Sequence, residues 1–281
     1  MPKIQICVFA YNLEHQLEKS IHSIITSLGS YEADIYIMAN GCKDNTVEVA
    51  KKIANNNHNI HIVELLFGDK SNAWNVFTYE YYDKGAIPIF ADGDLEFEKD
   101  AISNLINFHL NNPIYNSISS FPSDNGRSAK SWRKELVEKH QFTGALYLLS
   151  KDFIAKIIKC DLKLPIHLIG DDSMLGYLSA TNLEQNSDHP EERIGVCQDA
   201  IFKYDPLNVF SFADIKLYLR RRTRYSIRYM QQTCIVPRLK KHGLQVMPKD
   251  ASSLPRQHLP AIRWNSSNML FDIIAKYQLT H

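Results

Sequence analysis

Apolar positions in the first hundred residues alternate between two periods. Residues 4–8 place apolar side chains at every second position, which predicts a strand, and residues 13–28 repeat them at helical spacing. The same succession recurs, with strands predicted over 34–39, 60–66 and 86–91 and helices over 44–53, 71–82 and 102–108. Strands and helices that alternate at this pace indicate a mostly parallel central sheet flanked by helices.

Beyond residue 113 the pattern is less regular. Residues 114–131 are rich in Ser, Asn, Pro and Gly, which predicts loops. Further elements are expected as a strand over 142–149, helices over 151–158 and 170–178, a polar loop over 181–193, a basic helix over 210–230 and an apolar run over 269–275. We therefore expect an α/β domain over 1–208, with halves of about 1–110 and 111–208, and a basic, mainly helical extension over 209–281.

Composition narrows the class of protein. The 281 residues are 44% hydrophobic, enough for a sizeable core, and the formal net charge of +1 argues against a nucleic-acid partner. The five cysteines are widely spaced and form no CxxC pair, so a zinc site or a disulfide framework is not expected. No export signal or apolar run of membrane-spanning length is evident in the sequence. We expect a cytoplasmic protein, in contact with a membrane only at its periphery.

Polar clusters follow three of the predicted strands. Tyr11-Asn12 follows the first strand, residues 40–44 follow the second, and Asp92-Gly93-Asp94 follows the fourth. The carboxyl ends of parallel strands lie at one edge of a sheet, where α/β proteins bind their ligands. The sequence thus predicts one binding site built from three clusters.

The Asp92-Gly93-Asp94 cluster suits a metal–diphosphate. Two carboxylates at i and i+2 can lie on one side of the chain, and the glycine between them allows close backbone approach. Mg²⁺ and Mn²⁺ prefer carboxylate and phosphate oxygens. Asp-Gly-Asp is also an ordinary turn, and only its position after a strand, beside two other clusters, favours the metal interpretation.

A second acidic pair, Asp171-Asp172, opens a predicted helix after Gly170. Carboxylates at a helix start cap free N–H groups and match the helix dipole, which is the structural interpretation. In the functional interpretation one acid is a general base that takes a proton from a hydroxyl nucleophile. Spacing alone slightly favours the structural role.

The stretch 216–241 is basic and contains no acid. It carries Lys216, Arg220, Arg221, Arg222, Arg224, Arg228, Arg238, Lys240 and Lys241. Such a run can be a solvated helix face, but closely packed like charges repel and favour an anionic partner. The candidates are the diphosphate of a donor, a lipid-diphosphate acceptor and an anionic membrane surface.

The order of these clusters resembles the inverting glycosyltransferases of family 2, which have the GT-A fold. The resemblance covers roughly residues 3–230. It rests on Ala10-Tyr11-Asn12-Leu13-Glu14, Asn40-Gly41-Cys42-Lys43-Asp44-Asn45-Thr46, Gly68 with Lys70 and Ala73-Trp74-Asn75, Asp92-Gly93-Asp94, Asp171-Asp172 with Leu175, and Arg221-Arg222-Thr223-Arg224-Tyr225. The absence of P-loop, dinucleotide-binding and G-x-S-x-G motifs agrees with this assignment.

The resemblance implies metal-dependent transfer of a sugar from a nucleotide-sugar donor, a UDP-sugar being expected, onto a glycan or lipid-linked acceptor. It implies Asp172 as the general base with Asp171 beside it, Asp94 and Asp92 as ligands of Mn²⁺ or Mg²⁺, and Gly144 and Ala145 near the acceptor. The donor would be bound by Ala10, Tyr11, Asn12, Glu14, Asn40, Gly41, Asp44, Lys70, Asn75, Asp92, Gly93, Arg221 and Arg224.

The sequence also departs from the family pattern. Asn40 stands where Asp is common, Asp171 where Glu is common, and Arg-x-x-Arg-Tyr replaces Gln-x-x-Arg-Trp, which weakens the case for a processive synthase. Two alternatives therefore stay open. One is a non-catalytic nucleotide- or glycan-binding module on this scaffold, since a fold does not fix function. The other, weaker one is a sugar-phosphate nucleotidyltransferase, whose glycine-rich first turn is replaced here by residues 10–12.

Overall fold

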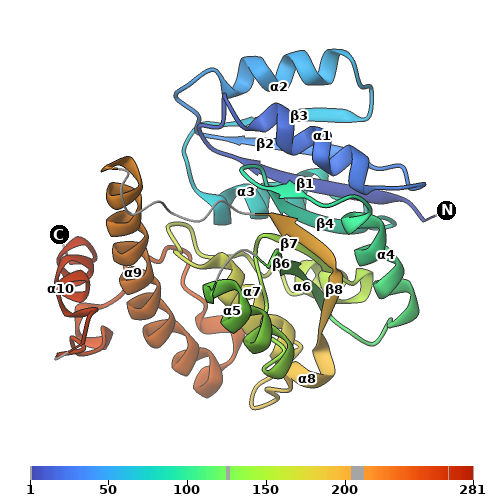
Figure 1. The fold of residues 1–281 in the computed structure, drawn as a ribbon. Helices are drawn as coiled ribbons and strands as arrows, with labels where there is room; N and C mark the ends of the chain where they lie inside the picture. The colour runs from blue at the N-terminus through green and yellow to red at the C-terminus, as the bar shows by residue number, and fades with distance from the viewer. Residues whose placement is uncertain (1, 125–126, 204–211, 265, 281) are drawn as a thin grey trace.

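The computed structural model describes residues 2–124, 127–203, 212–264 and 266–280. Within them, eight strands form one sheet in the order β3-β2-β1-β4-β7-β6-β8-β5 (Figure 1). The strands are β1 (Ile4–Ala10), β2 (Asp34–Asn40), β3 (Ile60–Leu65), β4 (Ile87–Asp92), β5 (Glu96–Phe97), β6 (Ser117–Pro122), β7 (Leu146–Leu149) and β8 (Ile194–Lys203). The helices are α1 (Leu17–Ser27), α2 (Thr46–Asn55), α3 (Lys70–Val76), the π-helix η1 (Phe77–Tyr81), α4 (Ala101–Asn111), α5 (Arg127–Glu138), α6 (Lys151–Lys159), α7 (Asp171–Thr181), α8 (Pro190–Arg193), α9 (Phe212–His242), the short 3₁₀ turns η2 (Leu244–Val246) and η3 (Arg256–His258), and α10 (Met269–Gln278).

The first half of the sheet is parallel, as the alternating pattern predicted. β1 pairs in parallel with β2 and β4, and β2 with β3. All seven residues of β1 are buried, and their alternation divides them between the two faces. Ile6 and Val8 join the core under α1 and α4, whereas Cys7 and Phe9 join the core under α3 and α6. The strand ends that carry the polar clusters therefore meet at one edge.

The second half of the sheet is mixed, and here the loop prediction for 114–131 was wrong. These residues contain β6 and the start of α5, and β6 pairs antiparallel with β7 and parallel with β8. The sequence of β6 resembles a loop because its serines are polar, yet all of them are buried, and two of them are hydrogen-bonded. The Ser117 hydroxyl lies 2.6 Å from that of Ser179, and the Ser119 hydroxyl accepts a hydrogen bond of 3.1 Å from the Thr143 amide.

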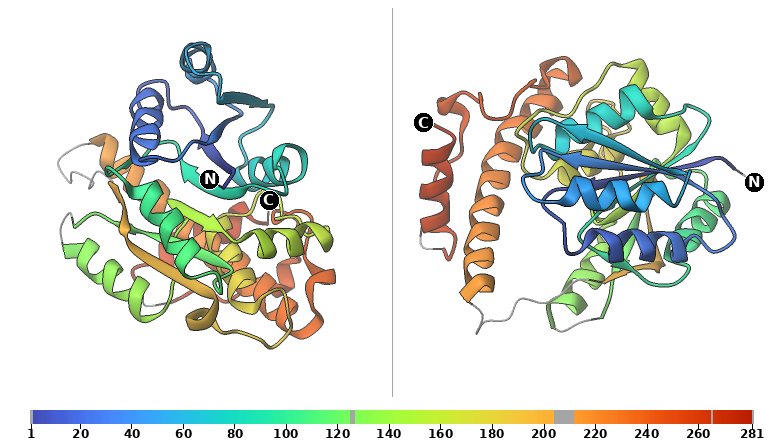
Figure 2. Two further views of the ribbon diagram at one scale, coloured as in Figure 1. Left: turned by 90° about the vertical axis from the view of Figure 1, so that its right-hand side faces the viewer. Right: turned by 90° about the horizontal axis from the view of Figure 1, so that it is seen from above.

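The C-terminal part is helical, and α10 packs on the outer side of α9, away from the sheet (Figures 1 and 2). The middle of α9 contacts the segment that leads into α7. Gln231 accepts from the Ile169 amide at 2.8 Å and donates to the His167 carbonyl at 2.9 Å, and Gln232 donates to the Gly170 carbonyl at 3.2 Å. In the part of the chain described here, no helix combines the length and the apolar character needed to cross a membrane.

Candidate active site

The turns after β1 and β2 are joined into one rim by hydrogen bonds. The Asn12 side chain accepts from the Lys43 amide at 2.8 Å, the Asp44 carboxylate from the Glu14 amide at 3.1 Å, and the Glu14 carboxylate from the Asn45 amide at 3.0 Å. Asp44 precedes the N-cap of α2, Asn45, by one residue. The structure thus brings together the two turns that the sequence assigned to one donor site.

A close backbone contact shapes the same rim. A Cβ on Gly41 would lie 2.3 Å from the Gly68 nitrogen, and Gly41 has a φ of +65°, so no other residue fits there without strain. A Cβ on Gly68 would lie 2.9 Å from the ring of Tyr11, which is 42% exposed. Asn40 is buried and accepts from the Asp69 amide at 2.9 Å, so its amide holds the loop that carries Gly68.

Ala10, the last residue of β1, offers the rim only its backbone. Its side chain is buried in the core, and its carbonyl accepts from the Cys42 thiol at 3.4 Å. This contact adds a further link between the turns after β1 and β2.

The Asp92-Gly93-Asp94 cluster begins at Asp92, the last residue of β4. Asp92 accepts a 2.5 Å hydrogen bond from the Lys70 ammonium. The Gly93 amide donates to the Phe9 carbonyl at 2.9 Å, and a Cβ there would lie 2.8 Å from the same oxygen, so glycine is required by close approach. The Asp94 carboxylate is exposed and has no hydrogen-bond or ion-pair partner among the described residues.

Lys70 connects this cluster with the acidic pair of α7. Its ammonium lies 3.5 Å from Asp171, whose buried Oδ2 has no hydrogen-bond donor among the described residues. Burial would lower the pKa of Lys70, but the charges of Asp171 and Asp92 outweigh it and raise that pKa above its ordinary value. Burial raises the pKa of Asp92 to about 7, against the opposing effect of Lys70 and with a further contribution from Asp94. The site therefore holds more carboxylate than its lysine balances.

Asp172 is oriented by an arginine from α9. The Arg228 guanidinium donates to Asp172 Oδ1 at 2.6 Å and to the Ser173 hydroxyl. Two glycines make the arrangement fit. A Cβ on Gly170 would lie 2.5 Å from Arg228 Nε, and one on Gly144 would lie 2.7 Å from Asp172 Cβ. The N-cap residue of α7 is Gly170, which has no side chain to cap the helix. Neither Asp171 nor Asp172 therefore acts as the N-cap residue.

A cavity of about 620 Å³ opens in front of Asp172. Asp172, Ser173 and Arg228 line it, together with the aromatic side chains of Trp132, Phe142, Tyr177 and Tyr225. Gly144 and Ala145, predicted near the acceptor, lie behind the residues that line this cavity. Gly144 contacts Asp172, and the Ala145 carbonyl accepts from the Asp92 amide at 2.9 Å. Aromatic faces beside a fixed carboxylate suit a ligand that has both apolar surface and hydroxyl groups.

Three residues assigned to the donor site from the sequence make no hydrogen bond or ion pair, among the described residues, with the rim or with Asp92 and Asp94. The Asn75 amide is paired at both ends with the backbone of Leu164, donating at 2.8 Å and accepting at 2.9 Å, which joins α3 to the segment before α7. Arg221 and Arg224 are exposed on α9, seven and four residues before Arg228. Helical spacing places both on the same side of α9 as Arg228.

Sequence reasoning missed the roles of Arg228 and Asp69. Arg228 was noted only as part of the basic stretch, although its spacing from Arg224 places it on the same side of the helix. Asp69 caps α3 by accepting from Asn72 at 2.7 Å, and it also accepts from the His167 amide at 2.5 Å. No local signal distinguishes Asp69, because its second partner lies 98 residues along the chain.

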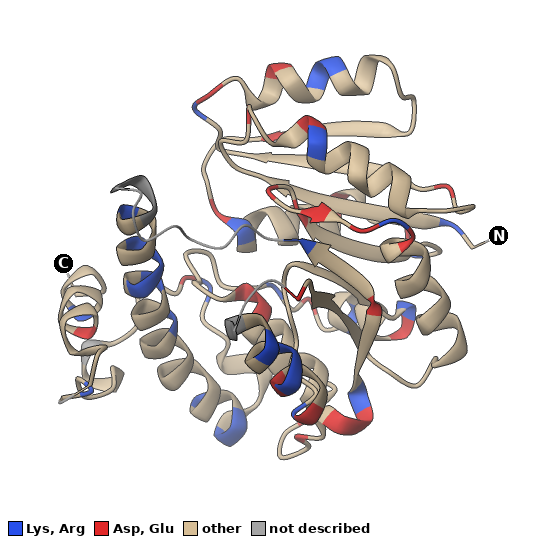
Figure 3. Ribbon diagram, in the orientation of Figure 1, with Lys and Arg blue, Asp and Glu red and all other residues tan. Residues whose placement is uncertain are grey.

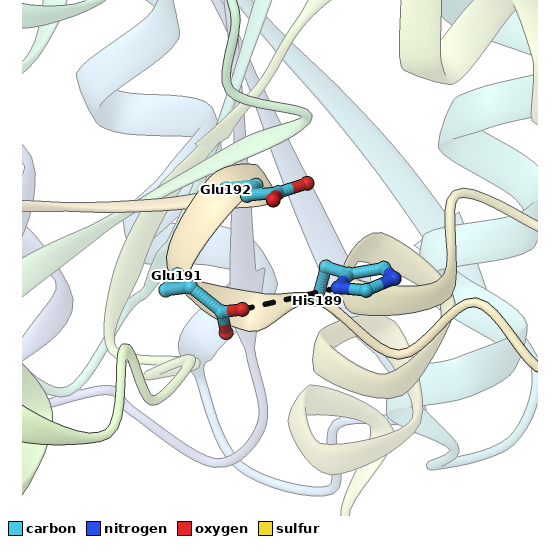
Figure 4. Close-up of side chains that lie close together, drawn as sticks. All are labelled: His189, Glu191 and Glu192. Atoms are coloured by element: carbon cyan, nitrogen blue, oxygen red, sulfur yellow. Dashed lines mark ion pairs between the residues drawn. The ribbon is translucent and has the colours of Figure 1, made fainter.

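A separate cluster of possible metal ligands lies on α8. His189, Glu191 and Glu192 offer atoms within 4.8 Å of one another, and the His189 ring lies 3.8 Å from Glu191 (Figure 4). Both glutamates are exposed, and an exposed acidic group of this kind is common without a metal. Asp92 and Asp94, the metal ligands expected from the sequence, offer carboxylate oxygens of the kind that Mg²⁺ and Mn²⁺ prefer, and they lie at the end of β4 rather than near α8.

Comparisons with known proteins agree with this geometry. The family described as glycosyl transferase family 2 matches residues 5–166, more than half of the chain. The fold is similar to that of the mannosyltransferase PcManGT from Pyrobaculum calidifontis in complex with GDP-Man and Mn²⁺, with a TM-score of 0.65 and 14% identity over 99% of this chain and 74% of the other. It is also similar to TarS 1-349 from S. aureus in complex with UDP-GlcNAc, with a TM-score of 0.55 and 12% identity over 91% of this chain and 82% of the other. No curated protein sequence matches the chain.

The parallel first half and mixed second half of the sheet, together with the similar solved structures, define a GT-A fold. The chain belongs to glycosyl transferase family 2.

Proposed function

We propose that this glycosyltransferase moves a sugar from a nucleotide-diphosphate sugar to an acceptor hydroxyl, with inversion at the anomeric carbon and with a divalent metal. One observation carries the proposal. Lys70 contacts both Asp92 at the end of β4 and Asp171 at the start of α7, and the adjacent Asp172 lines the cavity. A single displacement needs this arrangement, with a base on one side of the reacting carbon and charge stabilisation on the other.

The nucleotide would lie against the rim formed by the turns after β1 and β2. Tyr11 presents an exposed ring for stacking, and Asn12, Glu14 and Asp44 form the polar edge around it. A UDP-sugar is the proposed donor, and a GDP-sugar is the second donor to be tested. The similar folds contain UDP-GlcNAc in one case and GDP-Man in the other, which supports testing both.

Asp94 and Asp92 would hold Mn²⁺ or Mg²⁺. The exposed Asp94 carboxylate and the second oxygen of Asp92 fit a hard cation, and the surplus of carboxylate around Lys70 favours binding of positive charge. A metal bound there neutralises charge that develops on the departing diphosphate. Arg221 and Arg224, exposed on α9, are proposed to contact the same diphosphate.

Asp172 is proposed as the general base. Arg228 holds Oδ1, which leaves Oδ2 to accept the proton of the acceptor hydroxyl. The hydroxyl oxygen forms its bond to the anomeric carbon as the bond from that carbon to the diphosphate oxygen breaks, and the configuration inverts. Asp171, buried beside Lys70, would support the base as the neighbour of Asp172 or would contact the acceptor.

The acceptor is proposed to be a glycan or a lipid-linked glycan, in assembly of a bacterial-type surface polysaccharide or glycolipid. The aromatic lining of the cavity supports a sugar acceptor, because sugar rings stack their apolar faces on aromatic side chains. The basic stretch 216–241 supports an anionic group near the acceptor, such as a lipid diphosphate.

A thermal-shift panel tests the proposal. UDP, GDP, CMP and their sugars would each be added with and without Mn²⁺. A ligand at 100 times its Kd adds roughly 2.7 kcal/mol, which raises Tm by several degrees for a chain of this size. A shift that needs both metal and one nucleotide supports the proposal, and release of free sugar from that donor separates an enzyme from a binding module. No shift with any nucleotide would contradict it.

A further inference from the structure

Lys70 is shared unequally between two carboxylates that belong to different elements. Its ammonium donates a 2.5 Å hydrogen bond to Asp92 Oδ1 at the end of β4 and lies 3.5 Å from Asp171 Oδ2 at the start of α7. The second distance is too long for a good hydrogen bond, and the buried Asp171 oxygen has no donor among the described residues. The lysine therefore has a second acceptor within reach of a small movement.

The carboxylates of the site outnumber the cations that balance them. There are four, those of Asp92, Asp94, Asp171 and Asp172. Among the described residues, Lys70 and Arg228 are the cations that form ion pairs with them. Arg228 belongs to α9, along which Figure 3 shows lysine and arginine, and its guanidinium is held by Asp172 and Ser173. Four carboxylates against two cations leave an excess of two negative charges when all are ionised, and Lys70 alone serves Asp92.

The Lys70 ammonium can change partner while its backbone stays in place. Lys70 is the first residue of α3, and the N-cap of this helix, Asp69, accepts from the Asn72 amide at 2.7 Å. The Lys70 side chain is 27% exposed, and its ammonium lies 5.0 Å from the centroid of the Phe9 ring. A flexible four-carbon stem lets the charge shift by rotation about side-chain bonds. The Asp92 side chain is 31% exposed, so a cation from solvent can reach its second oxygen.

A divalent cation held by Asp92 and Asp94 would compete with Lys70 for Asp92. One carboxylate would then carry a divalent ion and an ammonium, and these repel strongly at a separation of a few ångströms in a site with limited exposure to water. Asp171 Oδ2 offers the ammonium another carboxylate on its other side. A shift to Asp171 would relieve the repulsion and give a buried acceptor its missing donor.

We propose that Lys70 is a two-position lysine, which neutralises Asp92 until a divalent cation binds there and then pairs with Asp171. The proposal rests on Asp92 and Asp94 as metal ligands in the proposed function. Its consequence is that binding of the cation brings positive charge fully onto the acidic pair of α7, beside Asp172. Lys70 is then a positioning residue that links the two sides of the active site through Asp171.

The test measures binding of Mn²⁺ alone, without nucleotide, to the full chain by electron paramagnetic resonance of the free ion. Lys70→Met removes the charge and nearly keeps the length of the side chain, and Lys70→Gln removes the charge but keeps a hydrogen-bond donor. The matched control is Lys3→Met, because Lys3 pairs with Asp83 at 2.9 Å and its loss changes the net charge equally. The thermal shift with Mn²⁺ alone is measured on every variant, so that a destabilised variant is still informative.

Removal of the competing ammonium should tighten Mn²⁺ binding by about tenfold or more in both Lys70 variants and leave it unchanged in Lys3→Met. The thermal shift with Mn²⁺ should be larger in the Lys70 variants than in the parent. Unchanged or weaker binding in both Lys70 variants would overturn the inference, because Lys70 would then be a fixed support of Asp92 that stays in place beside the bound ion.

Asp171→Asn tests the second position through a double-mutant cycle with Lys70→Met. In the parent, loss of the second acceptor should leave the ammonium on Asp92 and weaken Mn²⁺ binding by about tenfold. In the Lys70→Met background only the direct loss of one negative charge remains, so the weakening should be several times smaller. Equal weakening in the two backgrounds would contradict a movement of Lys70 to Asp171.

Asp94→Ala separates failure of this inference from failure of the proposed function. If Asp94→Ala loses Mn²⁺ binding while the Lys70 variants bind as the parent does, the metal site stands and only the role of Lys70 is wrong. If Asp94→Ala binds Mn²⁺ as tightly as the parent, or if neither the parent nor any variant binds it, the metal assignment is wrong and the inference about Lys70 fails with it.

Discussion

The donor side and the base side of the active site hold their side chains by different means. On the donor side, the turns after β1 and β2 are joined mostly by hydrogen bonds between side chains and backbone amides, between residues about 30 apart. On the base side, Asp172 is fixed by an ion pair with Arg228, 56 residues away and on a different helix. The first arrangement is determined by two adjacent strands, whereas the second exists only once α9 has packed against α7.

The difference has a consequence for how each side responds to change. Several separate hydrogen bonds join the two turns, so the donor rim should tolerate the loss of single side chains with limited change in shape. A carboxylate held by one guanidinium loses its orientation when either partner is replaced. Donor binding and transfer are therefore expected to be separable by substitutions on the two sides.

Asp172→Asn is expected to have the largest effect on transfer. Removal of the base at almost constant volume should lower kcat by about 10²–10⁴-fold, while the metal-dependent thermal shift with donor stays close to that of the parent. Initial-rate kinetics with donor in excess measure the effect. Asp188→Asn is the matched control, because Asp188 lines the same cavity but pairs with Lys240 at the surface. Turnover near the parent level would remove Asp172 from the role of base.

Asp94→Ala is expected to act on the donor side of the active site. Loss of a proposed metal ligand should remove most of the difference between thermal shifts with and without Mn²⁺ and lower transfer by about 10²-fold or more. Asp152→Ala, at an exposed acid in the first turn of α6, serves as the control. If the response of Asp94→Ala to Mn²⁺ matches that of the parent, the metal site is elsewhere.

Arg228→Gln should have a smaller effect, because it leaves the base present but removes its orientation. We expect kcat to fall about tenfold, with the KM for donor unchanged, since a misplaced catalytic group loses part of its advantage. Arg238→Gln, on the same helix, is the control. A fall in donor binding equal to the fall in kcat would mean that the two sides are not separable.

The positions of the strand-end residues could be predicted from the sequence better than the packing around Asp172, for a physical reason. The elements around the rim are amphipathic over their whole length and their polar turns are contiguous, so periodicity and motif order locate Tyr11, Asp44 and Asp92. The strand β6 was not predicted because its serines are polar, and the partners of Ser117 and Ser119 lie in distant parts of the chain. Asn75 was assigned to the donor from its position in a motif, but its pairing with Leu164 depends on a segment 89 residues away. The role of Arg228 likewise depends on helix packing that no local pattern encodes.

Asp272→Asn is expected to have the smallest effect on transfer and tests whether the base side depends on α10. Asp272 is fully buried against Arg263, so loss of its charge should lower the free energy of unfolding by about 3 kcal/mol. If the middle of α9 is held by α7 alone, kcat below the unfolding temperature should stay within about twofold of the parent. Asp188→Asn, which breaks an exposed pair, should cost about 1 kcal/mol or less. A large loss of transfer would show that α10 supports Arg228.

The pH dependence of the same variant identifies the cause. The hydrogen bond and charge of Arg263 outweigh burial and lower the pKa of Asp272 from 3.8 to about 2. A carboxylate with a lowered pKa in the folded protein stabilises it above its unfolded pKa and loses that contribution as pH falls towards its folded pKa. The difference in Tm between parent and Asp272→Asn should therefore be full at pH 7, begin to shrink near pH 4 and be mostly lost by pH 2. A difference that is constant over this range would mean that the aspartate stabilises α10 by shape and hydrogen bonding rather than by its charge.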